Sequence, residues 1–183
     1  MAEKGKKTKK GRKSYLNDIR PNLAGEYVYV GDYYSFVPDG KTFPRALGEI
    51  IALSLLGFLG LVAAGFVEAG GMGNCFYVII PYMGEAISLF ILLWAVSKLL
   101  FKGSKLREYV YGSSVLRIPG GSIVTAAFSA AGILAIIVFT ILNGIDGSAL
   151  EYILLLGGKG LTIASMLLLR KLMKSLRWEI VGK

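Results

Sequence analysis

Two charged residues, Glu85 and Lys159, stand inside long apolar stretches, and they are the residues that could carry chemistry. A charge within a membrane helix costs about 2.5–3.5 kcal/mol to insert and marks a candidate functional site. Three interpretations follow: a structural ion pair, two side chains that reach separately for the lipid headgroups, or a site for transport or proton relay. The chain has no histidine and a single cysteine, Cys75. We therefore expect no metal site, no cofactor and no enzymatic activity.

The composition indicates a protein that lies in a lipid bilayer. Of the 183 residues, 54% are hydrophobic and 18% are charged, and the mean hydropathy is +0.59. A soluble domain averages about 45–50% apolar and about 25% charged residues. A membrane span takes about 20 mostly apolar residues, which predicts helices at 47–67, 78–101, 123–142 and 152–172. The predicted fold class is an all-α membrane protein with four transmembrane helices.

The basic residues predict how these helices are oriented. Of the 21 lysines and arginines, ten precede the first helix, five lie at or after the end of the second, and five lie near or after the end of the fourth. Only Lys159 lies well within a span. Positive charge is retained on the cytoplasmic side of a membrane. We expect a multipass protein of the plasma membrane with both termini in the cytoplasm.

Residues 1–23 are predicted to form a disordered, basic cytoplasmic tail. Its clustered cations are Lys4, Lys6, Lys7, Lys9, Lys10, Arg12 and Lys13. Such a run cannot bury a core, and its expected partner is a surface of anionic lipid headgroups. Contact with RNA or the ribosome is the alternative, but the distribution of charge favours a membrane surface over nucleic acid.

The tetrapeptide Glu-Tyr-Val-Tyr occurs twice, each time ahead of a predicted pair of helices. Its residues include Glu26, Tyr27 and Tyr29 in the first copy and Glu108, Tyr109 and Tyr111 in the second. We predict a duplicated two-helix unit, with repeats at 24–101 and 102–183 and a pseudo-two-fold axis along the membrane normal. The alternative is that tyrosine-rich segments arose independently at the membrane boundary, where aromatic residues are favoured.

Each copy of the motif is expected to form short β-hairpin-like strands at the cytoplasmic surface. In the first copy, aromatic and β-branched residues flank Gly31-Asp32, which resembles a tight turn. The two copies could pair with each other, or either could bind a partner by strand addition.

Small residues at helical spacing predict close packing of helix backbones. They are Gly60, Ala64, Ala127, Ala131, Ala135, Gly160 and Ala164. Packing within one bundle is the first interpretation, and a face for homo-oligomerisation is the second.

The sequence favours a non-enzymatic structural or accessory subunit of a membrane assembly. The two loops predicted to lie outside the cell, at residues 68–77 and 143–151, are too short to bind much. Residues that could act in catalysis are scarce. The alternative is a small transporter or channel that uses Glu85 and Lys159. The sequence identifies neither a substrate nor a partner.

Overall fold

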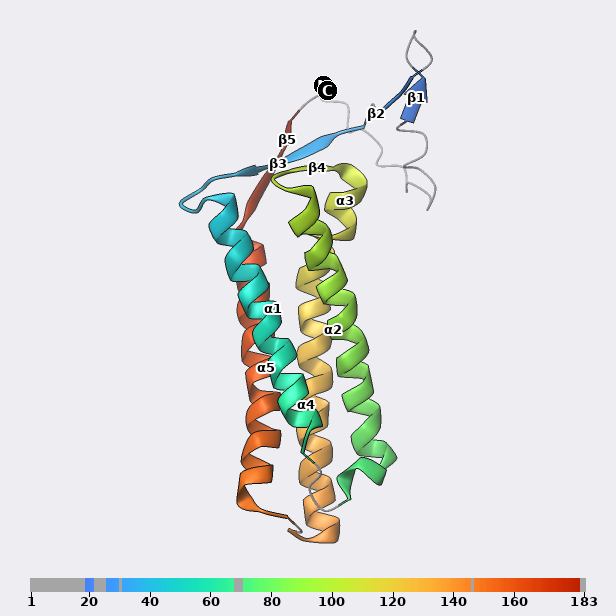
Figure 1. The fold of residues 1–183 in the computed structure, drawn as a ribbon, viewed down its shortest axis with the longest axis vertical. Coiled ribbons are helices and arrows are strands. Elements are labelled where there is room, and N and C mark those ends of the chain that lie inside the picture. Colours follow the sequence, from blue (N-terminus) through green and yellow to red (C-terminus); the bar gives the residue numbers. More distant parts are fainter. Residues whose placement is uncertain (1–18, 22–25, 30, 68–70, 146, 182–183) are drawn as a thin grey trace, which may run out of the picture.

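In a computed structural model, four long helices form an elongated bundle, and short strands lie at one end of it (Figure 1). The structure describes residues 19–21, 26–29, 31–67, 71–145 and 147–181. The long helices are α1 (Phe43–Gly65), α2 (Phe76–Lys102), α4 (Arg117–Asn143) and α5 (Ala149–Ser175). The short elements are β1 (Ile19–Pro21), β2 (Tyr27–Tyr29), β3 (Tyr33–Val37), η2 (Met72–Asn74), β4 (Lys105–Arg107), α3 (Glu108–Ser113) and β5 (Arg177–Val181). We refer to the end that carries β3, β4 and β5 as the sheet end, and to the other as the loop end.

All four predicted spans are confirmed as long apolar helices. They contain 23 to 27 residues each, so they measure about 35–40 Å, longer than the roughly 30 Å hydrocarbon core of a bilayer. Helix α4 begins at Arg117, six residues before the predicted start at residue 123. Pro119 permits this early start, because amide groups in the first turn have no partner within the helix.

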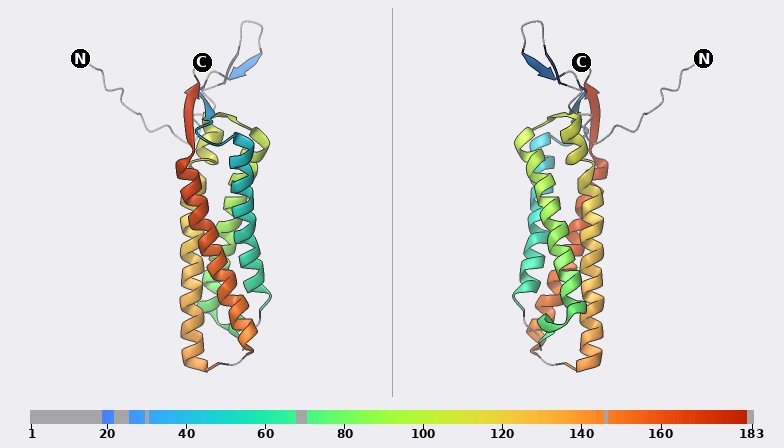
Figure 2. Two further views of the ribbon diagram at one scale, coloured as in Figure 1. Left: turned by 90° about the vertical axis from the view of Figure 1, so that its left-hand side faces the viewer. Right: turned by 90° about the vertical axis from the view of Figure 1, so that its right-hand side faces the viewer.

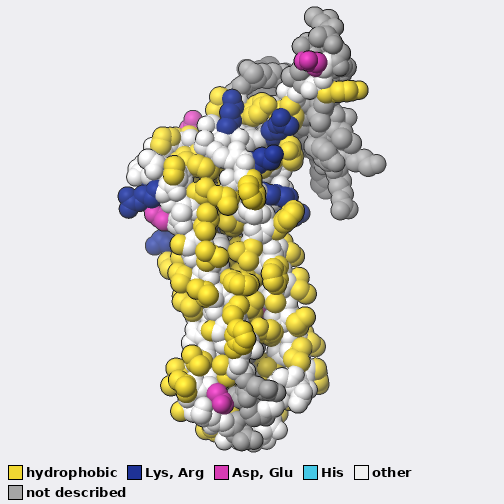
Figure 3. Space-filling model, in the orientation of Figure 1, with side chains coloured by type: hydrophobic (Ala, Val, Ile, Leu, Met, Phe, Trp, Pro, Cys, Tyr) yellow, Lys and Arg dark blue, Asp and Glu magenta, His cyan; other side chains and the backbone are white. Residues whose placement is uncertain are grey.

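The distribution of side chains is that of a membrane protein. The body of the bundle exposes large apolar residues, among them Leu59, Phe90 and Trp94 (Figure 3). Small hydroxyl side chains lie inside instead, and seven of them in the four long helices are buried: Ser54, Ser88, Ser122, Thr125, Ser129, Thr162 and Ser165. This arrangement suits a lipid solvent, in which outward apolar surface costs nothing and polar groups need partners inside the protein.

The four helices run along the length of the molecule in the order α1, α5, α4, α2 around the bundle (Figure 2). Helix α1 packs closely along α5, α2 along α4, and α4 along α5, whereas α1 and α2 touch over a short length. An ideal two-fold axis would make the contact of α1 with α2 equivalent to that of α4 with α5. The bundle departs from this symmetry where α1 and α2 meet.

Three antiparallel strands form a small sheet in the order β4-β3-β5. Strand β4 follows α2, and β5 follows α5. Tyr33 of β3 pairs with Arg107 on one side and Val181 on the other. These two partners are 74 residues apart in the chain, which is also the spacing of Glu85 and Lys159.

Five aromatic rings join this sheet to the helices. They belong to Tyr34, Phe36, Phe43, Tyr111 and Trp178. The rings of Tyr34 and Tyr111 stack with centroids 4.0 Å apart, and the Trp178 ring meets those of Phe36, Phe43 and Tyr111 edge to face. The last strand is therefore anchored to α1 and α3, and residues 177–181 are part of the sheet.

The two copies of the Glu-Tyr-Val-Tyr motif have different structures, which corrects the expectation of a hairpin in each. In the first copy, Tyr27 and Tyr29 lie in β2, which pairs with β1 and not with β3 across Gly31-Asp32. The second copy forms helix α3. The copies do not pair with each other as strands in the described structure, because a helical segment has no free backbone groups to offer a neighbouring strand.

Individual motif residues nevertheless meet neighbouring parts of the sheet end. Tyr29 lies edge to face against Tyr33, and its ring lies beneath the guanidinium of Arg107 at 5.1 Å. Tyr27 is exposed, Glu26 lies in the segment just before it, and Glu108 and Tyr109 open helix α3. The cations predicted to contact lipid, Lys4 to Lys13, lie outside the described residues.

Candidate functional site

Glu85 of α2 and Lys159 of α5 form an ion pair inside the bundle. The Lys159 ammonium contacts Glu85 Oε2 directly, and the two side chains are 0% and 3% exposed. The structure therefore brings together the two charges that the sequence singled out. Of the three interpretations, separate side chains that reach for the headgroups do not fit this geometry.

Helix geometry explains why the two side chains meet. Glu85 lies nine residues after the first residue of α2, and Lys159 lies ten residues after that of α5. At 1.5 Å per residue both lie about 14–15 Å along their helices from the loop end. Both helices run from the loop end to the sheet end, so the charges reach nearly the same depth.

Tyr82 and Gly132 complete the surroundings of the Lys159 side chain. The ammonium lies 4.6 Å from the centroid of the Tyr82 ring, which is a favourable position for a cation over an aromatic face. A Cβ atom at Gly132 would lie 3.3 Å from Lys159 Cε, so the glycine lets α4 approach the lysine stem. Tyr82 precedes Glu85 by three residues, and this spacing is a signal in the sequence that would have placed the two on one face.

One oxygen of the pair stays unsatisfied. Glu85 Oε1 is buried and has no hydrogen-bond partner among the described residues. A carboxylate with an unused acceptor inside an apolar bundle is costly, and such positions are found where water, a proton or a ligand takes part in function.

Hydroxyl groups fasten the three close helix contacts around the pair. Ser129 of α4 donates a hydrogen bond to the carbonyl of Lys159, and Thr162 of α5 donates to the carbonyl of Gly57 in α1. Between α2 and α4, the hydroxyl oxygens of Ser88 and Thr125 are 3.0 Å apart. Ser129, Thr162 and Thr125 therefore link four helices through the same region that holds the ion pair.

A pocket at the loop end reaches Lys159. Its volume is about 310 Å³, and its lining is mostly apolar, with Tyr82 and Lys159 as the polar side chains of two helices. All four long helices contribute to its lining, among them α1 with Ala64 and Gly65 and α2 with Ile79. The Tyr82 hydroxyl connects α2 to α1 here, since it lies 3.5 Å from the carbonyl of Leu61.

The predicted packing residues divide into two groups. Gly60, Ala64 and Ala135 are buried, and a Cβ at Gly60 would lie 2.5 Å from the carbonyl oxygen of Gly158. The backbones of α1 and α5 are thus in contact at a pair of glycines, as predicted for Gly60.

Three other small residues, Ala127, Gly160 and Ala164, face outward. The prediction that they pack inside the bundle is wrong, because they lie on the opposite helix faces from the buried Ser129 and Thr162. Ala131 is half-buried. For the three outward residues, a face between copies of the chain stays a prediction.

Within the described residues no three cysteine or acidic side chains gather closely enough to hold a metal ion. Comparisons of the chain with protein-family models, with curated proteins and with solved structures gave no match. The site must accordingly be interpreted from its own geometry: a neutral ion pair under a small, mostly apolar pocket.

Proposed function

We propose that the chain is a multipass protein of the plasma membrane whose sheet end faces the cytoplasm. Four helices that are long and apolar enough to cross a membrane support an integral membrane protein. Among the described residues from Lys41 onward, Lys159 is the sole cation away from the sheet end, and lysine and arginine are retained on the cytoplasmic side. Figure 3 shows the blue side chains of the visible face at that end.

The single cysteine makes the orientation testable. Cys75 lies at the loop end, just before α2. A membrane-impermeant maleimide added to intact cells should label it. Moving the thiol to the sheet end, with Cys75→Ser and Gly112→Cys, should abolish labelling until the cells are opened. Gly112 suits this control because it is exposed and a Cβ there meets no atom within 4 Å. The reverse pattern of labelling would refute the orientation.

For the role of the chain we propose a non-enzymatic accessory subunit that docks onto a larger membrane assembly. The observation that carries this proposal is the unpaired outer edge of β5. In the described structure β5 is an edge strand of the sheet. It also exposes Ile180 and Val181, which are 58% and 44% accessible. An exposed edge with apolar side chains is a template for a strand from another protein.

Affinity purification in mild detergent tests this role. The wild-type chain, taken from native membranes, should bring down a second membrane protein in fixed proportion. Ile180→Lys adds a charge to the edge of β5 and should lose that partner. Tyr27→Lys is the matched control, because Tyr27 is 79% exposed in the other small sheet. Recovery of this chain alone from the wild-type preparation would contradict the proposal.

A small transporter is the second candidate, favoured by the pocket that reaches Lys159 and by the unsatisfied Glu85 Oε1. Charge exchange separates the two roles. If the pair is structural, the double variant Glu85→Lys with Lys159→Glu should be more stable than either single variant. If the pair handles a solute, all three variants should lose flux in vesicles at normal expression.

We also infer that the chain arose by duplication of a two-helix unit. In support, five buried residues of α2 have buried counterparts in α5 at a spacing of 74 residues: Glu85 and Lys159, Ser88 and Thr162, Leu92 and Met166, Ala95 and Leu169, Leu99 and Met173. The same spacing relates the residues of β4 and β5 that pair with β3. Under this inference the ion pair joins equivalent positions of the two halves.

A further inference from the structure

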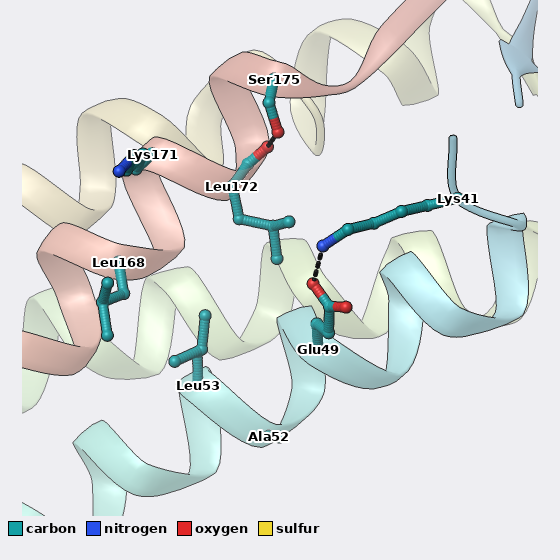
Figure 4. A pocket seen from close by; sticks show the side chains of 8 residues that line it. All are labelled: Lys41, Glu49, Ala52, Leu53, Leu168, Lys171, Leu172 and Ser175. Carbon is teal, nitrogen blue, oxygen red and sulfur yellow. Dashed lines mark hydrogen bonds and ion pairs between the residues drawn. The ribbon is translucent and has the colours of Figure 1, made fainter. Parts of the chain in front are cut away.

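A second hollow lies at the sheet end, between α1 and α5, far along the helices from the ion pair (Figure 4). It is an open groove of about 500 Å³. Lys41, Glu49, Ala52, Leu53, Leu168, Lys171, Leu172 and Ser175 line it. We refer to these eight residues as the interfacial groove.

Positive charge exceeds negative charge around the interfacial groove. Lys41 Nζ lies 2.5 Å from Glu49 Oε2, and Arg45 Nε lies 3.7 Å from Glu49 Oε1. One carboxylate therefore faces two cations. Lys171 is exposed on the opposite wall, and within the described residues it forms no ion pair. Three cations against one carboxylate leave two positive charges in excess.

The groove changes from polar to apolar along the bundle axis. Lys41 lies before the first turn of α1, and Lys171 lies in the last turns of α5. Leu53 and Leu168 lie deeper in the bundle, on the two facing helices, as Figure 4 shows. Glu49 is six residues from the start of α1, or about 9 Å, which places this boundary near the depth at which headgroups meet hydrocarbon.

We propose that the interfacial groove binds an anionic phospholipid from the leaflet at the sheet end. The phosphate lies between Lys41 and Lys171, and an acyl chain lies along Leu53 and Leu168. The excess of positive charge selects an anionic headgroup, and the leucines select a molecule with a hydrocarbon chain. Basic pockets between membrane helices are suited to such headgroups. The proposal depends on the membrane location of the helices and not on any role as a subunit.

Lipid binding to the purified full-length protein tests this site. Short-chain phosphatidylglycerol and phosphatidylcholine are titrated into the protein in mild detergent, and bound lipid is counted by native mass spectrometry. The wild type should retain one phosphatidylglycerol more tightly than phosphatidylcholine. Because one lysine near an anionic lipid changes binding about fivefold, Lys41→Gln with Lys171→Gln should weaken that site about 30-fold.

Lys174→Gln is the matched control, since Lys174 is an exposed lysine of the same helix that does not line the groove. It should leave the tight site unchanged, and the basic tail is identical in every variant. Lys171→Gln alone keeps the contact of Lys41 with Glu49 and should weaken binding about fivefold. This single variant tests the site even if the double variant folds poorly. Equal loss in Lys174→Gln, an unchanged preference in the double variant, or equal competition by inorganic phosphate would each overturn the proposal.

Discussion

Replacing one partner of the Glu85–Lys159 pair should destabilise the protein far more than replacing both. Glu85→Leu leaves the lysine ammonium in the bundle without its carboxylate, and Lys159→Met leaves the carboxylate without its ammonium. The double variant removes both charges and keeps side chains of similar volume. Removing one partner exposes the full cost of a buried charge, whereas apolar replacement of both avoids that cost.

The structure sets the size of the expected effect. Both side chains are almost fully buried, at 0% and 3% exposure, so solvent cannot replace the partner that either charge loses. Breaking such a pair costs about 3–5 kcal/mol for either single variant. Since about 1.4 kcal/mol is a factor of ten, the unfolding equilibrium should shift by about 10²- to 10⁴-fold. The double variant should lose at most about 1 kcal/mol, or gain stability, because the unpaired Glu85 Oε1 disappears with the carboxylate.

Equilibrium unfolding in mixed detergent micelles, followed by circular dichroism, measures these free energies. Lys174→Met is the control for loss of a lysine on α5, because that side chain is exposed. It should change stability by less than about 0.5 kcal/mol. If the losses of the two single variants simply add in the double variant, the charges do not stabilise each other, and the interpretation of Glu85 and Lys159 as a structural pair is wrong.

Three further predictions concern other contacts. Gly60→Ala should cost about 1–3 kcal/mol in the same unfolding assay, because its Cβ would meet the Gly158 carbonyl at 2.5 Å, whereas Gly157→Ala has open space and should be tolerated. Trp178→Leu removes a ring that meets three others, so β5 should exchange its amide hydrogens faster while the helices stay protected; unchanged exchange would refute the anchoring role. Ser148→Ala removes one half of a capping box and should lower the stability by about 1 kcal/mol in thermal unfolding, whereas Ser148→Asp keeps a capping oxygen and should retain that stability.

Membrane helices are the part of this fold that sequence predicts best. A long apolar run has one outcome in lipid, since backbone groups must be satisfied within the segment itself. The contact between Glu85 and Lys159 could also be predicted as one alternative, because the helical rise places both residues at similar depth and an unpaired charge there is costly. A single sequence does not give the order of the helices around the bundle, and in the structure α2 and α5 lie diagonally opposite, so the two side chains meet across its interior.

Short elements at the sheet end were harder to predict, because their structure depends on distant contacts. The second Glu-Tyr-Val-Tyr segment is helical, and its Tyr111 ring stacks on Tyr34 from β3. A tetrapeptide carries too little preference to resist such packing. Strand β5 had a weak signal, the alternation of polar and apolar residues from Arg177 to Ile180, but the residues of β3 with which it pairs lie at least 140 positions earlier in the chain.

Helix periodicity also did not show which of the small residues face the interior of the bundle. Gly160 and Ala164 satisfy the spacing for close packing, and so do Gly158 and Thr162 two residues away. The structure packs the second pair against α1, because a threonine hydroxyl in that position also donates to the carbonyl of Gly57. In lipid an inward hydroxyl with a partner is favoured over an inward methyl group.

Strand β3 is paired on both of its sides, and this has a mechanical consequence. Its two neighbours continue directly from α2 and α5, so the ends of both helices are tied to one strip of backbone. A change in the angle between these helices must therefore hinge at the sheet, and displacement must grow toward the far end. That far end holds the pocket that Lys159 lines, so a change in this angle alters the shape of the pocket more than the packing near the sheet.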